Sequence, residues 1–138
     1  MTLENIANNY GIEYIILYED CPGYILFAGS NALLMIERIK EECYPIRNIE
    51  VSKKKSNGYE FDCCYSLSRN NNESMPEFTN RSCIEAEKFI RKILKHKGDF
   101  LFELTIEDFK SEGNVTEHSS TSSQLFKVKK WFTNLLGK

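Results

Sequence analysis

The feature that most constrains the fold is a pair of strand-like runs joined by the dipeptide Asn57-Gly58. The runs cover Ile46 to Lys53 and Tyr59 to Leu67, and β-branched and aromatic residues recur in them. An Asn-Gly pair between two such runs is a strong signal for a tight hairpin turn. The sequence therefore predicts an antiparallel β-hairpin that turns over residues 54–58.

The second strand of this hairpin alternates in a way that predicts its two faces. The side chains expected to share the core face are Tyr59, Phe61, Cys63, Tyr65 and Leu67. The side chains expected on the opposite face are Glu60, Asp62, Cys64 and Ser66. The carboxylates of Glu60 and Asp62, with Glu103 on a later strand, are oxygen ligands of the kind a hard cation takes. A solvated sheet face is their commoner role, so no metal site is predicted.

Two helices and a further hairpin are predicted before this point. Thr2 can cap a short helix that Gly11 ends. The runs 12–19 and 24–28 are strand-like and flank a Pro-Gly turn, which predicts a first hairpin. Ser30 or Asn31 is predicted to cap a second helix. Its inward positions recur at helical spacing, at Ala32, Met35, Ile36, Ile39 and Cys43.

A third helix and a last strand follow the central hairpin. Residues 69–81 are polar and predict a loop, and Ser82 with Glu85 has the spacing of a capping box. The helix that follows is predicted to end at Gly98 and to bury Ala86, Phe89, Ile90, Ile93 and Leu94. The alternation of Phe100, Phe102, Leu104 and Ile106 predicts the final strand.

These elements predict an α+β fold with an antiparallel sheet. After the first strand, the order β-α-β-β-α-β is that of a ferredoxin-like plait, here extended by the N-terminal hairpin. An alternative arrangement is two β-β-α units around a curved sheet. The predicted α+β domain spans residues 1–110, a serine-rich flexible linker spans 111–123, and an amphipathic basic C-terminal helix spans 124–138.

The sequence offers no constellation for catalysis or for a cofactor. Its five cysteines contain no Cys-x-x-Cys pair, which argues against zinc and favours free thiols in a reducing compartment. It has two histidines, His96 and His118, and the sequence pattern gives neither of them a nucleophile and an acid with which to form a catalytic site. No signal-like or membrane-spanning run is present. We therefore expect a non-enzymatic cytoplasmic protein without cofactor.

Two basic features favour a nucleic-acid-binding α+β plait as one functional alternative. They are the hairpin tip Lys53, Lys54 and Lys55, and the outward face of the helix 82–97 with Lys88, Arg91, Lys92 and Lys95. Exposed aromatic residues on the sheet would stack bases. Tyr59 and Phe61 are predicted to lie on the core face of their strand, so they are not expected to stack on bases. The residues 1–124 also carry a net charge of −6, because the total is −2 and residues 125–138 carry four lysines and no acid.

The C-terminal helix favours a small protein-interaction module of the inhibitor, immunity or adaptor type. The residues expected to contact a partner are Leu125, Val128, Trp131, Phe132 and Leu135. An isolated helix of this length is marginal in water, so it needs a surface to pack on. That surface can be a protein partner, an anionic membrane or its own domain. Of these, a protein partner is the favoured prediction.

Overall fold

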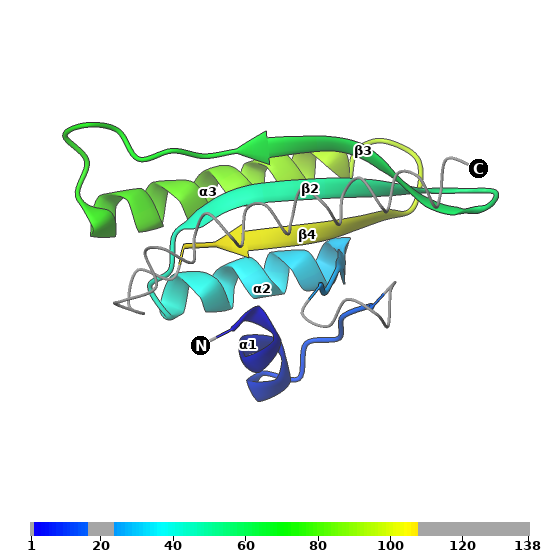
Figure 1. Ribbon diagram of the computed structural model, residues 1–138, viewed down its shortest axis with the longest axis horizontal. Helices are drawn as coiled ribbons and strands as arrows, with labels where there is room; N and C mark the ends of the chain where they lie inside the picture. The colour runs from blue at the N-terminus through cyan, green and yellow to red at the C-terminus, as the bar shows by residue number, and fades with distance from the viewer. Residues whose placement is uncertain (1, 17–23, 108–138) are drawn as a thin grey trace.

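The computed structural model describes residues 2–16 and 24–107. These residues form an α+β fold with three helices and a four-stranded antiparallel sheet, as Figure 1 shows. The helices are α1 (Leu3–Asn9), α2 (Gly29–Glu41) and α3 (Met75–Ile93). The strands are β1 (Phe27–Ala28), β2 (Ile46–Lys55), β3 (Gly58–Ser66) and β4 (Phe100–Ile106). The predicted linker 111–123 and helix 124–138 lie outside the described residues.

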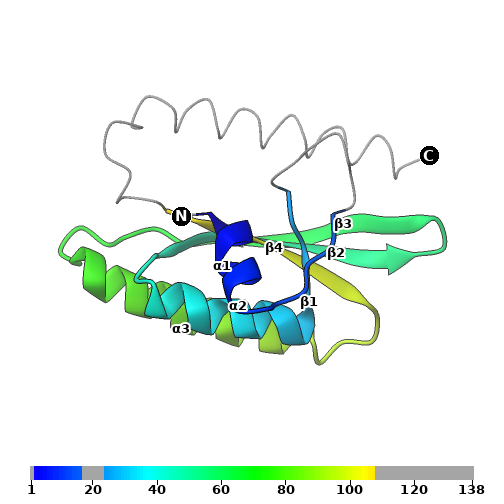
Figure 2. The same ribbon diagram turned by 90° about the horizontal axis from the view of Figure 1, so that it is seen from below.

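The core lies between one face of the sheet and the layer formed by α2 and α3, which Figure 2 shows from below. On that face, Ile49 and Val51 of β2 stand beside Leu104 and Phe102 of β4, and all four are buried. Tyr65 of β3 stacks on Phe89 of α3 with ring centroids 5.0 Å apart. We call this the helix face of the sheet, and the opposite one the second face.

The ferredoxin-like arrangement is not confirmed. The chain order β-α-β-β-α-β is present from β1 to β4, but the order in space is β1-β4-β2-β3. In a ferredoxin-like plait, the hairpin between the two helices places its second strand at the centre of the sheet. Here the first strand of that hairpin, β2, is central and pairs with both β3 and β4. The burial of the strands agrees with this order. β2 and β4 have buried residues on both faces, such as Glu50 and Leu101 on the second face, while much of β3 is exposed.

In the N-terminal part, the structure confirms the predicted first helix and one backbone pairing of the predicted first hairpin. Thr2 caps α1 by accepting a hydrogen bond from the Asn5 backbone N–H at 3.1 Å, and Gly11 follows the helix with a φ of +65°. Ile15 and Leu26 exchange two backbone hydrogen bonds of 2.7 and 2.9 Å. The predicted turn between them lies outside the described residues.

The start of α2 differs from the prediction. The helix begins at Gly29, directly after β1, so its N-cap is Ala28, which makes no side-chain cap. The predicted caps Ser30 and Asn31 therefore lie within the first turn. Leu94, at the C-terminal end of α3, packs against this junction between strand and helix. A Cβ on Gly29 would lie 2.5 Å from a Leu94 methyl carbon.

The start of α3 corrects the predicted capping box. The helix begins at Met75, within the predicted loop 69–81, and its box pairs Ser74 with Glu77. The Ser74 side chain accepts from the Glu77 N–H at 3.2 Å, and the Glu77 carboxylate accepts from the Ser74 N–H at 3.0 Å. Ser82 lies inside the helix and is fully buried. The same spacing occurs twice in the sequence, and Pro76 in the first turn favours the earlier one.

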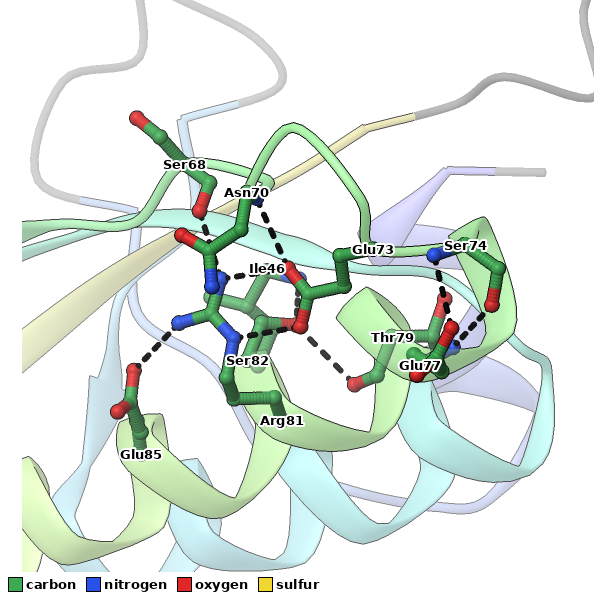
Figure 3. Close-up of polar contacts among 10 residues, drawn as sticks. All are labelled: Ile46, Ser68, Asn70, Glu73, Ser74, Glu77, Thr79, Arg81, Ser82 and Glu85. Atoms are coloured by element: carbon green, nitrogen blue, oxygen red, sulfur yellow. Dashed lines mark hydrogen bonds and ion pairs between the residues drawn. The ribbon is translucent and has the colours of Figure 1, made fainter.

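An ion-pair cluster holds the loop that leads into α3, as Figure 3 shows. The Arg81 guanidinium donates to both oxygens of Glu73 at 2.7 and 2.9 Å, and also to Glu85 and to the Ser68 carbonyl. The hydrogen bonds from Arg81 are the main reason why the pKa of Glu73 falls to about 2. This loop is therefore an ordered part of the fold, and its charged side chains hold structure in place.

Candidate nucleic-acid interface

Two basic segments that are distant in the sequence meet at one end of the molecule. The tip of the β2–β3 hairpin and the C-terminal end of α3 lie at the same end in Figures 1 and 2. The backbone N–H of Lys54 donates to the Asp99 carbonyl at 2.8 Å, and this hydrogen bond joins the hairpin to the α3–β4 loop. We call this end, with Lys53, Lys54, Lys55, Lys88, Arg91, Lys92, Lys95 and Lys97, the basic end.

Gly98 allows the close contact between the two segments. It has a φ of +134°, and a Cβ at this position would lie 2.9 Å from Cε of Lys53. The Lys53 ammonium group in turn lies 5.8 Å from the centre of the Phe100 ring. The sequence prediction assigned Gly98 to the C-cap of the helix. α3 instead ends at Ile93 with Leu94 as its C-cap, and Gly98 serves the following turn.

The basic end has a strong excess of positive charge. Lys54, Lys55 and the five basic residues of 88–97 are exposed, and Lys53 is half-buried. Among the described residues, Arg91 is the only one of these eight in an ion pair, with Glu87 at 3.2 Å. The nearby acids are Glu87, which pairs with Arg91, Glu60, which lies opposite Lys53, and Asp99. Such an excess attracts polyanions.

A β-bulge overturns the predicted faces of β3. Val51 pairs with Cys63, but the next residue, Ser52, pairs with Phe61, so Asp62 is an extra residue in β3. Directly paired residues share a face, and Ser52 also pairs with Leu101 on the second face. Phe61 and, two residues on, Tyr59 therefore lie on the second face. Cys63, Tyr65 and Leu67 remain on the helix face, as predicted.

Exposure agrees with this assignment. Phe61 is 47% exposed, and it takes no part in the core cluster to which Cys63 and Tyr65 contribute. Tyr59 is half-buried and lies directly opposite Lys54. The sequence argument against stacking, that Phe61 is a core residue, is therefore wrong. A bulge of one residue was not visible in a pattern with a period of two.

The three predicted acidic positions do not form one site. Glu60 pairs with Lys53 on the helix face, Glu103 pairs with Glu50 on the second face, and Asp62 is the extra residue of the bulge. Across residues 2–16 and 24–107, no three Cys, His, Asp or Glu side chains lie close enough together to hold a metal ion.

The half-buried thiol of Cys63 and the buried thiol of Cys83 are poorly placed to act as nucleophiles. Burial is the main factor that raises the pKa of Cys63 to about 11, and the Asp62 side chain adds to it. Burial likewise raises the pKa of Cys83 to about 11. Both thiols are therefore protonated at neutral pH, and the thiolate is the reactive form. Cys43 and Cys64 are exposed free cysteines.

Comparison with known proteins gives no relative. No family model, no curated protein and no solved structure matches this chain. Of the helices that the structure describes, none has the length and apolar character needed to cross a membrane. The predicted partner-binding residues from Leu125 to Leu135 lie outside the described residues.

Proposed function

We propose that this protein is a non-enzymatic module that binds the phosphate backbone of a nucleic acid at the basic end. The observation that carries the proposal is the junction of the hairpin tip with the α3–β4 loop through Lys54 and Asp99. Because of this junction, two lysine-rich segments act as one surface rather than as two solvated features. The net charge of −6 for residues 1–124 then helps to orient a polyanion toward this end.

The proposal predicts that both segments contribute to the binding of the same ligand. We expect Lys54→Gln with Lys55→Gln, and separately Lys92→Gln with Lys95→Gln, each to weaken binding roughly tenfold at low salt. Each pair removes two phosphate contacts, so the salt slope on a single strand falls by about 1.4. Fluorescence anisotropy of labelled oligonucleotides over a salt series measures both quantities.

Lys40→Gln with Arg69→Gln is the matched control, because it removes two exposed positive charges outside the basic end. We expect this variant to retain wild-type affinity and slope. Equal losses in all three variants would show a response to net charge alone. The absence of binding by the wild type at low salt would refute the proposal.

A protein-interaction module is the second candidate function, and the amphipathic pattern of residues 124–138 favours it. We propose that Trp131 and Phe132 anchor a protein partner in the cytoplasm, with an anionic membrane surface as the alternative target. Burial of two aromatic side chains contributes several kcal/mol to the binding free energy. Loss of that contribution would weaken a micromolar complex beyond detection.

This candidate predicts that Trp131→Ala with Phe132→Ala leaves the thermal midpoint of the protein unchanged and abolishes capture of a partner or of anionic vesicles. Calorimetry and pull-down measure the two effects. A fall of several degrees in the midpoint, roughly 4 °C per kcal/mol for a folded chain of 138 residues, would assign both residues to the protein's own core instead.

A further inference from the structure

Phe61 is the exposed aromatic residue closest in register to the hairpin tip on the second face. Leu101, which also pairs with Ser52, is 2% exposed, whereas Phe61 is 47% exposed. On the second face, the side chain of Leu101 in the central strand β4 is thus buried, whereas the side chain of Phe61 in the edge strand β3 is exposed to solvent. A single exposed apolar residue is ordinary in a protein. The surroundings of Phe61 make this one informative.

Those surroundings combine a second aromatic ring with a positive charge. The bulge at Asp62 turns both Phe61 and Tyr59 to the second face, and Lys54 stands directly opposite Tyr59. Residues diagonal to each other across a strand pair lie about 7–8 Å apart, within reach of a long side chain. Lys54 therefore lies within reach of a phosphate whose base contacts Phe61.

We propose that Phe61, with Tyr59 beside it, is a stacking platform for an unpaired base, so that the protein prefers single-stranded nucleic acid to a duplex. This inference rests on the proposed function, because it requires a strand whose phosphates bind the basic end. In a duplex the flat faces of the bases are covered by their neighbours. A single strand exposes them, and aromatic side chains stack on them without regard to sequence.

The platform and the basic end form one path for a strand. Lys54 belongs to the second face, while Lys53 lies on the helix face beside Phe100. A strand that stacks on Phe61 meets Lys54 and Lys55 at the tip and then the lysines after α3. Figure 2 shows the tip of the β2–β3 hairpin extending beyond the helix layer.

The test compares an oligothymidylate with a duplex of the same length, each labelled for anisotropy. We expect the wild type to prefer the single strand. Phe61→Ala should weaken single-strand binding by roughly 5- to 100-fold and leave duplex binding unchanged, whereas Phe61→Tyr should retain the preference. Ile84→Ala is the control, because Ile84 is also apolar and 40% exposed but lies on α3.

Photo-crosslinking of the oligothymidylate, followed by peptide mapping, locates the contact. We expect the crosslink in residues 56–69, which form one tryptic peptide that contains Phe61. If Phe61→Ala lowers binding to both ligands equally, or to neither, the stacking platform is refuted while binding at the basic end stands. If the wild type binds neither ligand, both proposals fail and a protein partner becomes the favoured occupant of this surface.

Discussion

Replacement of Phe102 by alanine is expected to lower the free energy of unfolding by about 3–5 kcal/mol. Phe102 is fully buried in the central strand β4, where it pairs with Val51 on one side and with Phe27 on the other. Its truncation removes apolar contacts and leaves a cavity between the sheet and the helix layer, which close-packed neighbours fill only in part. Urea unfolding followed by circular dichroism measures the change.

The matched control is Phe61→Ala, in the same sheet and of the same chemistry. Because Phe61 is about half exposed and outside the core cluster, we expect this variant to lose only about 0.5 kcal/mol. The difference between the two phenylalanines follows from the bulge at Asp62. A loss at Phe61 as large as that at Phe102 would mean that Phe61 is a core residue, and it would also remove the basis of the stacking platform.

Replacement of Ser82 by alanine is expected to cost about 1–3 kcal/mol, although only one oxygen is removed. The Ser82 Oγ accepts from the Ile46 N–H at 2.9 Å and donates to the Thr79 carbonyl at 3.1 Å. It thus ties α3 to the start of β2 in the core. Without the Ser82 hydroxyl, the Ile46 N–H remains buried but loses its hydrogen-bond acceptor. The cost of removing this N–H from water is then no longer offset by a hydrogen bond.

Ser74→Ala is the comparison for Ser82→Ala, because Ser74 is the serine that caps α3. Loss of an exposed N-cap costs about 1 kcal/mol, so the buried serine should be the more costly of the two. Hydrogen exchange provides a second measurement, since the Ile46 amide should lose protection in Ser82→Ala alone. If Ser82→Ala costs less stability than Ser74→Ala, the buried hydrogen bonds of Ser82 contribute less than the N-cap, and this prediction is wrong.

Much of the fold was predictable because local chemistry decides it. The spacing of apolar residues predicted α2 and the central hairpin within a few residues, and Thr2 and Gly11 bounded α1 as predicted. It predicted the existence of α3 but placed its cap at Ser82 instead of Ser74. The turn chemistry placed the hairpin correctly, with Ser56 and Asn57 as the turn and a φ of +120° at Gly58. These signals act between residues that are close in the chain, so the sequence contains them directly.

The candidate site was predictable only in its parts. The lysines of the tip and of α3 were identified from the sequence, and the structure describes them as exposed or half-exposed. Their union depends on the Lys54–Asp99 hydrogen bond, which joins residues 45 positions apart. The role of Phe61 depends on one extra residue in β3, and a period-two pattern assigns the wrong face to every residue on the far side of such a bulge.

The sequence by itself determined the type and approximate extent of α1, α2, β2, β3 and β4, and the existence of α3, because propensity, capping and turn formation are local. The tertiary structure alone decided the strand order β1-β4-β2-β3, the choice of Ser74 over Ser82 as the cap, and the exposure of Phe61. Each of these is a competition between two locally acceptable arrangements. Burial settles such a competition, and burial depends on which distant segments pack together.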